Sequence, residues 1–123
     1  MTRIGGGLFA SKPTREGESV LWSVRANRQQ GSRRAVGGRF HLTTERLVFT
    51  PHLLDAALGG RPWVAERSEI VRISKEPRDA SKLLGGGLRG RLRIEIQEEP
   101  PKFFVVNELN EVINRLRESG AAN

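Results

Sequence analysis

Arginine is the residue type with which this chain can do most of its chemistry. The sequence holds 21 lysines and arginines against 14 aspartates and glutamates, giving a formal net charge of +7. One group of arginines lies in a stretch that contains no acid, and its members are Arg25, Arg28, Arg33, Arg34 and Arg39. A planar guanidinium can donate two parallel hydrogen bonds to phosphate or carboxylate oxygens. The group therefore predicts a binding site for an anionic headgroup, and the alternative is a solvated loop that binds nothing.

A second basic segment covers residues 72–93 and also carries a net charge of +5. Within it, three arginines occupy alternate positions, Arg89, Arg91 and Arg93. Alternate residues of a strand lie about 7 Å apart on one face, so these side chains would form a basic stripe suited to an acidic ligand. The alternative for this stripe is cross-strand pairing with acids such as Glu66, Glu69 or Glu98.

Other residues that could support catalysis or metal binding are sparse. The chain has no cysteine, which excludes disulfides, thiolate metal sites and a cysteine nucleophile. His41 and His52 are the only histidines, and His52 precedes Asp55 by three positions without a third ligand or nucleophile at a suitable spacing. We therefore expect no catalytic residue, no metal, no cofactor and no enzymatic activity.

Two further ligand classes are disfavoured by their sequence context. Residues 85–90 read G-x-G-x-x-G, but a dinucleotide site needs a strand before this motif and a helix after it, whereas a loop precedes it here and a strand pattern follows. Binding of single-stranded nucleic acid relies on exposed aromatic side chains beside the charge. The seven aromatic residues fall mostly at predicted inward positions, so we expect no sequence-specific nucleic-acid binding, although nonspecific phosphate binding stays open.

Apolar residues recur at every second position along most of the chain, which predicts short β-strands. The predicted strands are residues 19–27, 35–43, 46–50, 63–67, 69–75, 88–97 and 102–106. In the second and third strands, the residues predicted to point inward are Val36, Gly38, Phe40, Leu42, Leu47 and Phe49. Gly38 would let two parts of a bent sheet approach closely, and His41 is predicted to point outward.

The hydrophobic period changes near Asn107. Apolar residues then follow at helical spacing, as Leu109, Val112, Ile113 and Leu116, with Asn107 as the predicted N-cap and Gly120 as the predicted stop. We expect a mainly β fold, a bent seven-stranded antiparallel sheet or partly open barrel capped by this C-terminal helix. The predicted domain covers residues 18–119, between a flexible arm at 1–17 and a tail at 120–123.

In this order the residues resemble a GRAM domain, a member of the pleckstrin-homology-like (PH-like) superfold. The resemblance covers residues 17 to about 117. It is carried by Gly17-Glu18-Ser19-Val20, Gly38, Phe40, Leu42-Thr43, Arg46-Leu47-Val48-Phe49-Thr50, Trp63, Glu69-Ile70 and Phe103-Phe104-Val105. It implies an adaptor, because several such domains bind phosphoinositides or other acidic lipids and others bind proteins. In related domains the headgroup lies by the loop between the first two strands, here residues 27–35 with Arg28, Arg33 and Arg34.

The sequence thus predicts a non-catalytic module that binds acidic phospholipid or another anionic headgroup at a membrane surface. The alternative is a protein-interaction module that uses a strand edge or the groove beside the helix. A composition of 17 arginines and four lysines is typical of a bacterial protein, and phosphoinositides are scarce in bacteria, so the lipid stays open. With no signal peptide and no run of about 20 apolar residues, we expect a cytoplasmic location, peripheral at the inner face of the membrane.

Overall fold

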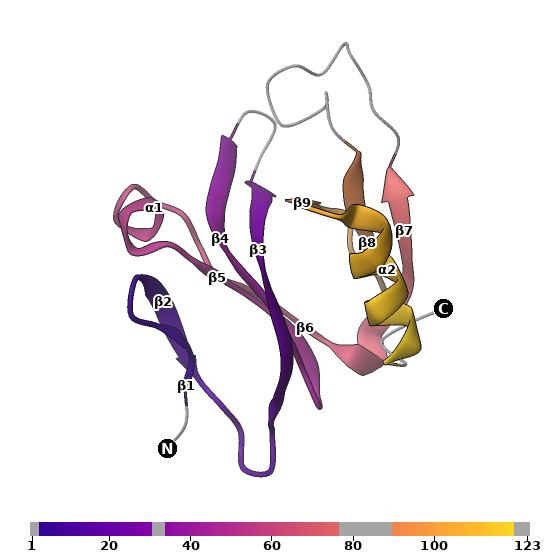
Figure 1. The fold of residues 1–123 in the computed structure, drawn as a ribbon, viewed down its shortest axis with the longest axis horizontal. Helices are drawn as coiled ribbons and strands as arrows, with labels where there is room; N and C mark the ends of the chain where they lie inside the picture. Colours follow the sequence, from indigo (N-terminus) through magenta and orange to yellow (C-terminus); the bar gives the residue numbers. More distant parts are fainter. Residues whose placement is uncertain (1–2, 31–33, 77–89, 120–123) are drawn as a thin grey trace.

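The computed structural model describes residues 3–30, 34–76 and 90–119, and the fold of these residues is mainly β (Figure 1). One antiparallel sheet of seven strands has the order β6-β5-β4-β3-β9-β8-β7. Its strands are β3 (Val20–Gln30), β4 (Arg34–Thr43), β5 (Arg46–Pro51), β6 (Trp63–Glu66), β7 (Ile70–Glu76), β8 (Arg91–Ile96) and β9 (Lys102–Val106). The predicted seven-stranded sheet is confirmed, and it stays open because β6 and β7 form its two edges.

The core lies on the inner face of this sheet. The predicted inward side chains of β4 and β5 are all buried, and Phe40 lies directly opposite Phe49 in the β4–β5 register. Phe104 of β9 joins them, with ring centroids 5.0 Å from Phe40 and 5.2 Å from Trp63. Aromatic packing therefore connects the two halves of the sheet, because β9 contributes to the same cluster as β4, β5 and β6.

Gly38 is required by the close approach of β4 and β5. A Cβ atom at this position would lie 2.3 Å from the Thr50 carbonyl oxygen and 2.8 Å from Cζ of Phe49. No side chain can be accommodated at those distances without moving the backbone of β5. The glycine at this inward position thus permits the sharp bend that the sequence predicted.

Helix α2 (Leu109–Glu118) covers the core beside β7, β8 and β9 (Figure 1). Its buried residues are Val112, Ile113 and Leu116, which confirms the predicted apolar stripe. The predicted N-cap is wrong, since Glu108 and not Asn107 occupies the N-cap position, and the Glu108 side chain makes no capping hydrogen bond. The chain must reverse within two residues after β9, and it does so with Glu108 in the left-handed region at φ 53°. The predicted stop, Gly120, lies outside the described residues.

The first residues of the chain, expected to be a loose arm, form a β-hairpin in the described structure. Strands β1 (Arg3–Gly6) and β2 (Phe9–Pro13) pair antiparallel, and Gly7 in their turn has φ +60°. Ile4 is only 1% exposed, and together with Phe9 it lines a hollow that reaches His41 on the outer face of the sheet. The hairpin lies against β5 and α1, which explains why outward-pointing residues of β4 and β5 are buried.

Two short helical segments complete the described chain. Helix α1 (Leu53–Ala57) follows β5, and the 3-10 helix η1 (Arg67–Glu69) joins β6 to β7. The imidazole of His52 caps α1, since its Nδ1 accepts a hydrogen bond from the Leu54 backbone N–H at 3.1 Å. Neither α1 nor α2 is long and apolar enough to cross a bilayer, and the described residues contain no other α-helix.

Candidate anionic-ligand site

Two arginines of the predicted cluster face each other on the outer side of the sheet. Arg25 of β3 lies directly opposite Arg39 of β4, on the face away from Ala26 and Phe40. No carboxylate of the described residues lies within ion-pair distance of either guanidinium. Like charges directly opposite each other destabilise a sheet, so the fold retains this pair at a cost. Such an arrangement attracts an anion that can neutralise both side chains.

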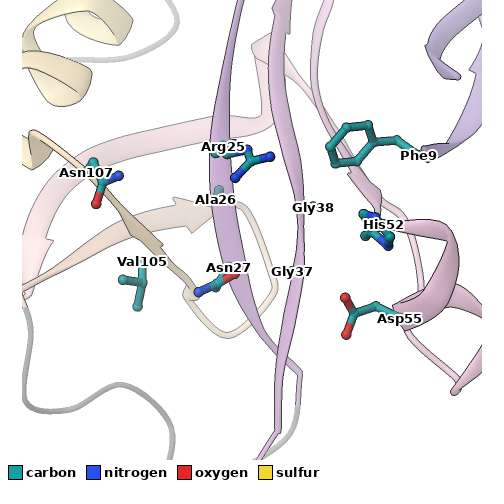
Figure 2. Close-up of a pocket in the computed structure, with 10 residues that line it drawn as sticks. All are labelled: Phe9, Arg25, Ala26, Asn27, Gly37, Gly38, His52, Asp55, Val105 and Asn107. Atoms are coloured by element: carbon teal, nitrogen blue, oxygen red, sulfur yellow. The ribbon is translucent and has the colours of Figure 1, made fainter. Parts of the chain in front are cut away.

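An open pocket of about 350 Å³ lies beside Arg25 (Figure 2). In Figure 2, β3 and β4 run through the middle, with Phe9, His52 and Asp55 on one side and Asn107 on the other. Gly37 lines the pocket between them, and a Cβ atom there would lie 3.3 Å from Oδ2 of Asp55. The absence of a side chain at Gly37 therefore keeps the space between the hairpin side and the β9 side open.

The N-terminal hairpin and α1 position the aromatic side of the site. The guanidinium carbon of Arg39 lies 5.3 Å from the Phe9 ring centroid, a cation–π distance. Phe9 in turn makes an edge-to-face contact with His52, with centroids 5.6 Å apart. Sequence reasoning missed Phe9 and His52 as site residues. The only signal was that Phe9 is the one aromatic residue among the first 21, and nothing in the spacing related it to Arg39.

The remaining members of the predicted five-arginine cluster do not join Arg25 and Arg39 in the described structure. Arg28 has the inward parity of Ala26, and its Nη1 donates to the Arg61 carbonyl at 3.3 Å. Burial lowers the pKa of Arg28. Arg33 lies outside the described residues, and of Arg34 only the backbone is described, at the start of β4. The five arginines were grouped because they are close in sequence, but the alternation of side chains along β3 places Arg25 and Arg28 on opposite faces of the sheet.

The side chain of Gln30 fastens the end of β3 to the loop that follows α1. Its Nε2 donates to the Gly59 carbonyl at 3.1 Å, and its Oε1 accepts from the Arg61 backbone N–H at 3.0 Å. Together with the bond from Arg28, these contacts hold the loop after α1 beside the β3–β4 end of the sheet. The exposed side chain of Arg61 is therefore placed at the same end of the molecule as Arg28.

The second predicted site is the arginine stripe of β8, and its described arginines already interact with other side chains of the protein. Arg89 lies outside the described residues. Arg91 is 3% exposed, donates to Oε1 of Gln29 and lies 4.4 Å from the Phe103 ring centroid. Arg93 pairs with Glu76 at 3.2 Å and approaches Glu95 at 3.9 Å. Acid pairing thus occurs, but not with Glu66, Glu69 or Glu98, because β8 lies between β7 and β9 and takes its partners there or from β8 itself.

Several residues that carry the family resemblance form a buried polar network. The Glu18 carboxylate accepts hydrogen bonds from Arg46 Nε at 2.7 Å, Arg46 Nη2 at 2.8 Å and Thr43 Oγ1 at 2.7 Å. The Arg15 backbone N–H donates to the same carboxylate at 3.0 Å. Hydrogen bonding from Arg46 lowers the pKa of Glu18 to about 2. This network anchors the β4–β5 turn, so these residues have structural roles.

The two histidines lie in different environments. His41 is buried, with Nδ1 2.7 Å from Ser23 Oγ and Nε2 2.9 Å from Thr50 Oγ1, and burial together with the nearby charge of Arg39 lowers its pKa to about 4. His52 caps α1 at the pocket wall. In the described ranges, no three His, Cys, Asp or Glu side chains are grouped so that they could hold a metal ion.

Comparison with solved structures places this architecture in a known class. The crystal structure of the C-terminal domain of an unknown protein from Leishmania infantum is similar over 85% of each chain, with a TM-score of 0.63 and 18% identity. The N-terminal PH domain of Vps36 is similar over 89% of this chain and 82% of that one, with a TM-score of 0.55 and 14% identity. The predicted PH-like fold is therefore confirmed. No family model and no curated protein matches the sequence, so assignment to the GRAM family stays a prediction.

Proposed function

We propose that this protein is a non-catalytic binding module that takes an acidic phospholipid, or another anionic headgroup, on the outer face of β3 and β4. The observation that carries the proposal is the pair Arg25 and Arg39, which face each other with no carboxylate of the described residues in ion-pair contact. A phosphate group between the two guanidinium groups would reduce their mutual repulsion and accept several charge-assisted hydrogen bonds.

The lining of the pocket supports a headgroup that joins a phosphate to hydroxyl groups. Arg25 lies at the pocket, and Arg39 is held beside it by Phe9. The Asn27 side chain offers an amide to hydroxyl groups of a headgroup, while Asp55 places a carboxylate on the wall beside α1.

Co-sedimentation with vesicles tests this proposal. At low salt, we expect more of the protein to pellet with phosphatidylcholine vesicles that contain phosphatidylglycerol than with pure phosphatidylcholine. A basic side chain near an anionic surface contributes on the order of 1 kcal/mol, so R25Q/R39Q should weaken binding roughly 30-fold. The matched control is R72Q/R115Q, which removes the same charge from exposed arginines elsewhere. Equal recovery on both vesicle types, or an equal loss in the control, would contradict the proposal.

Titration with a soluble headgroup separates lipid recognition from general phosphate binding. Glycerol phosphate and inorganic phosphate should each shift the backbone amide signals of Arg25, Gly37 and Arg39 in an NMR spectrum, because these residues border the site. Stronger shifts with glycerol phosphate indicate that the headgroup is read, whereas equal shifts indicate a phosphate site alone. Shifts confined to other surfaces would remove this face as the binding site.

Binding of a protein partner is the alternative function, and the edge of the sheet is its best-supported surface. Strand β7 is an edge strand, and Val71 on it is exposed. Part of this edge is already used, because Nη2 of Arg117 in α2 donates to the Ile73 carbonyl at 2.8 Å. A partner that adds a strand here would be retained by R25Q/R39Q, so a pull-down with this variant distinguishes the alternative from lipid binding.

A further inference from the structure

Four exposed leucines gather at the junction of the N-terminal hairpin and α1. Leu8, Leu54 and Leu58 are 67%, 66% and 65% exposed, and Leu53 is 48% exposed. The backbone N–H of Leu53 donates to the Leu8 carbonyl at 2.8 Å, which holds the hairpin turn against the start of the helix. We call these four residues the leucine patch. A single exposed leucine is ordinary, but a group of them on adjoining segments marks an interaction surface.

The leucine patch lies at one end of the molecule, next to the candidate anionic site. Figure 1 shows α1 at one end of the long axis, with β2 beside it and α2 near the opposite end. Phe9 and His52, the immediate sequence neighbours of Leu8 and Leu53, line the pocket that contains Arg25. A surface that meets the leucine patch can therefore also present a ligand to the pocket.

The charges around the leucine patch match an anionic bilayer. Residues 3–13 contain no acid, and Asp55 is the only acid between Arg46 and Ala65. Two arginines lie close to members of the patch along the chain or through a contact. Arg61 follows Leu58 by three residues and is exposed. Arg39 lies over the Phe9 ring, next in sequence to Leu8. Anionic headgroups above an apolar layer are complementary to leucines bordered by arginines.

We propose that the leucine patch inserts into the interfacial layer of an anionic bilayer, while Arg25 and Arg39 hold a lipid phosphate. This inference rests on the proposed function and adds to it the part of the surface that meets the acyl chains. The His52 cap and the bond from Leu53 to Leu8 fix the leucines before binding. Little conformational freedom of these segments is then lost on insertion, which favours binding.

A tryptophan placed in the leucine patch tests insertion directly. In L54W the new side chain replaces an exposed one, so the fold should persist, as circular dichroism would verify. With vesicles of phosphatidylcholine and phosphatidylglycerol, we expect its fluorescence to shift to the blue and to be quenched by brominated acyl chains. The wild-type protein supplies the background, since Trp22 and Trp63 lie outside the patch. Absence of quenching on vesicles that bind the protein would overturn the insertion.

Paired polar substitutions test the contribution to affinity. L54S/L58S should weaken vesicle binding at least tenfold, because the apolar area that enters the interface is reduced. The matched control, L21S/V71S, replaces two apolar residues of similar exposure that lie outside the patch, and it should bind like the wild type. Equal losses in both variants, or no loss in L54S/L58S, would contradict a specific role for the patch.

The outcomes separate this inference from the proposed function. If R25Q/R39Q abolishes vesicle binding and L54W shows no quenching, the results support the headgroup site and contradict insertion. If L54W is quenched equally on neutral and anionic vesicles, the result supports insertion and contradicts the headgroup site. A concentration-dependent mass in the absence of vesicles, which L54S/L58S abolishes, would show that the leucine patch joins two copies of the chain, and this result overturns the inference.

Discussion

At the scale of single residues, the pair formed by Arg25 and Arg39 has an energetic cost as well as a possible use. The two cations lie directly opposite each other on neighbouring strands, where like charges oppose the pairing of the sheet. Arg39 is partly compensated by the Phe9 ring, while no aromatic ring among the described residues makes such a contact with Arg25. Residues that lower stability without a structural gain are commonly those retained for binding.

This cost gives a prediction for Arg25. R25T should raise the free energy of unfolding by about 0.2–1 kcal/mol, because it removes the repulsion and places a good strand former in β3. The same variant should bind anionic vesicles more weakly than the wild type. Urea unfolding followed by tryptophan fluorescence measures the stability, and R72T is the control because Arg72 lies 4.0 Å from Glu95. A fall in stability for R25T would show that the arginine pair is not repulsive.

The Glu18 network gives a second residue-scale prediction, on pH dependence. The pKa of Glu18 is lowered from 4.5 to about 2 in the folded protein, so the folded state favours the charged carboxylate. The stability that it contributes is therefore fully present above pH 4.5 and is lost as the pH falls through about 2. E18Q leaves Arg46 buried without its counter-charge and should cost about 3 kcal/mol at pH 7.

Thermal unfolding at several pH values checks this expectation. The wild type should lose stability between pH 4.5 and 2 more steeply than E18Q, in which that component is absent. E99Q is the matched control, since Glu99 is exposed in the turn before β9 and should leave the wild-type curve unchanged. Parallel curves for the wild type and E18Q would rule out Glu18 as the source of the acid sensitivity.

At the scale of elements, periodicity predicted the seven strands of the sheet and α2, because the apolar residues of each recur at a regular spacing and pack in the core. The hairpin of β1 and β2 has no such pattern. Gly5 and Gly7 serve its irregular pairing and its turn, both with positive φ. The burial of sheet residues by this hairpin could not be predicted from the sequence either. His41 and Thr50 have outward parity, and they are buried only because another element covers them.

The hairpin is therefore a structural element whose contribution to stability is measurable. I4A should lower the free energy of unfolding by about 2–5 kcal/mol, because Ile4 is almost fully buried and its truncation leaves a cavity. L8A, in the turn of the same hairpin, should change stability by less than about 0.5 kcal/mol because Leu8 is exposed. Urea unfolding measures both. Equal and small effects would show that the hairpin does not stabilise the sheet.

At the scale of the whole molecule, the sequence predicted that arginines make the candidate site but not which of them act together. Strand parity separates Arg28 from Arg25, and the β3–β4 register brings Arg39 opposite Arg25 although 13 residues lie between them in the chain. The pocket also depends on Phe9 and His52, which belong to elements folded onto the sheet from elsewhere in the chain. Such a site is a property of the tertiary structure, so no local pattern could have revealed it.

The charge of the whole molecule and the apolar area of the leucine patch together determine how vesicle binding should depend on salt. The net charge of +7 acts through solvent, and its reach falls from about 10 Å at 0.1 M salt to about 3 Å at 1 M. Burial of the leucine patch is not screened, because it depends on apolar area and not on charge. Binding to anionic vesicles should therefore decrease with added KCl and then level off at the affinity that the leucines supply.

Co-sedimentation over a series of KCl concentrations separates these two contributions. The wild-type curve should fall and reach a plateau, whereas L54S/L58S should continue to fall until no protein pellets. R25Q/R39Q should start lower and show a shallower slope, because fewer cations near the surface remain to be screened. If the wild type and L54S/L58S both fall to zero along parallel curves, charge alone accounts for adsorption, and the leucine patch has no part in holding the protein at the membrane.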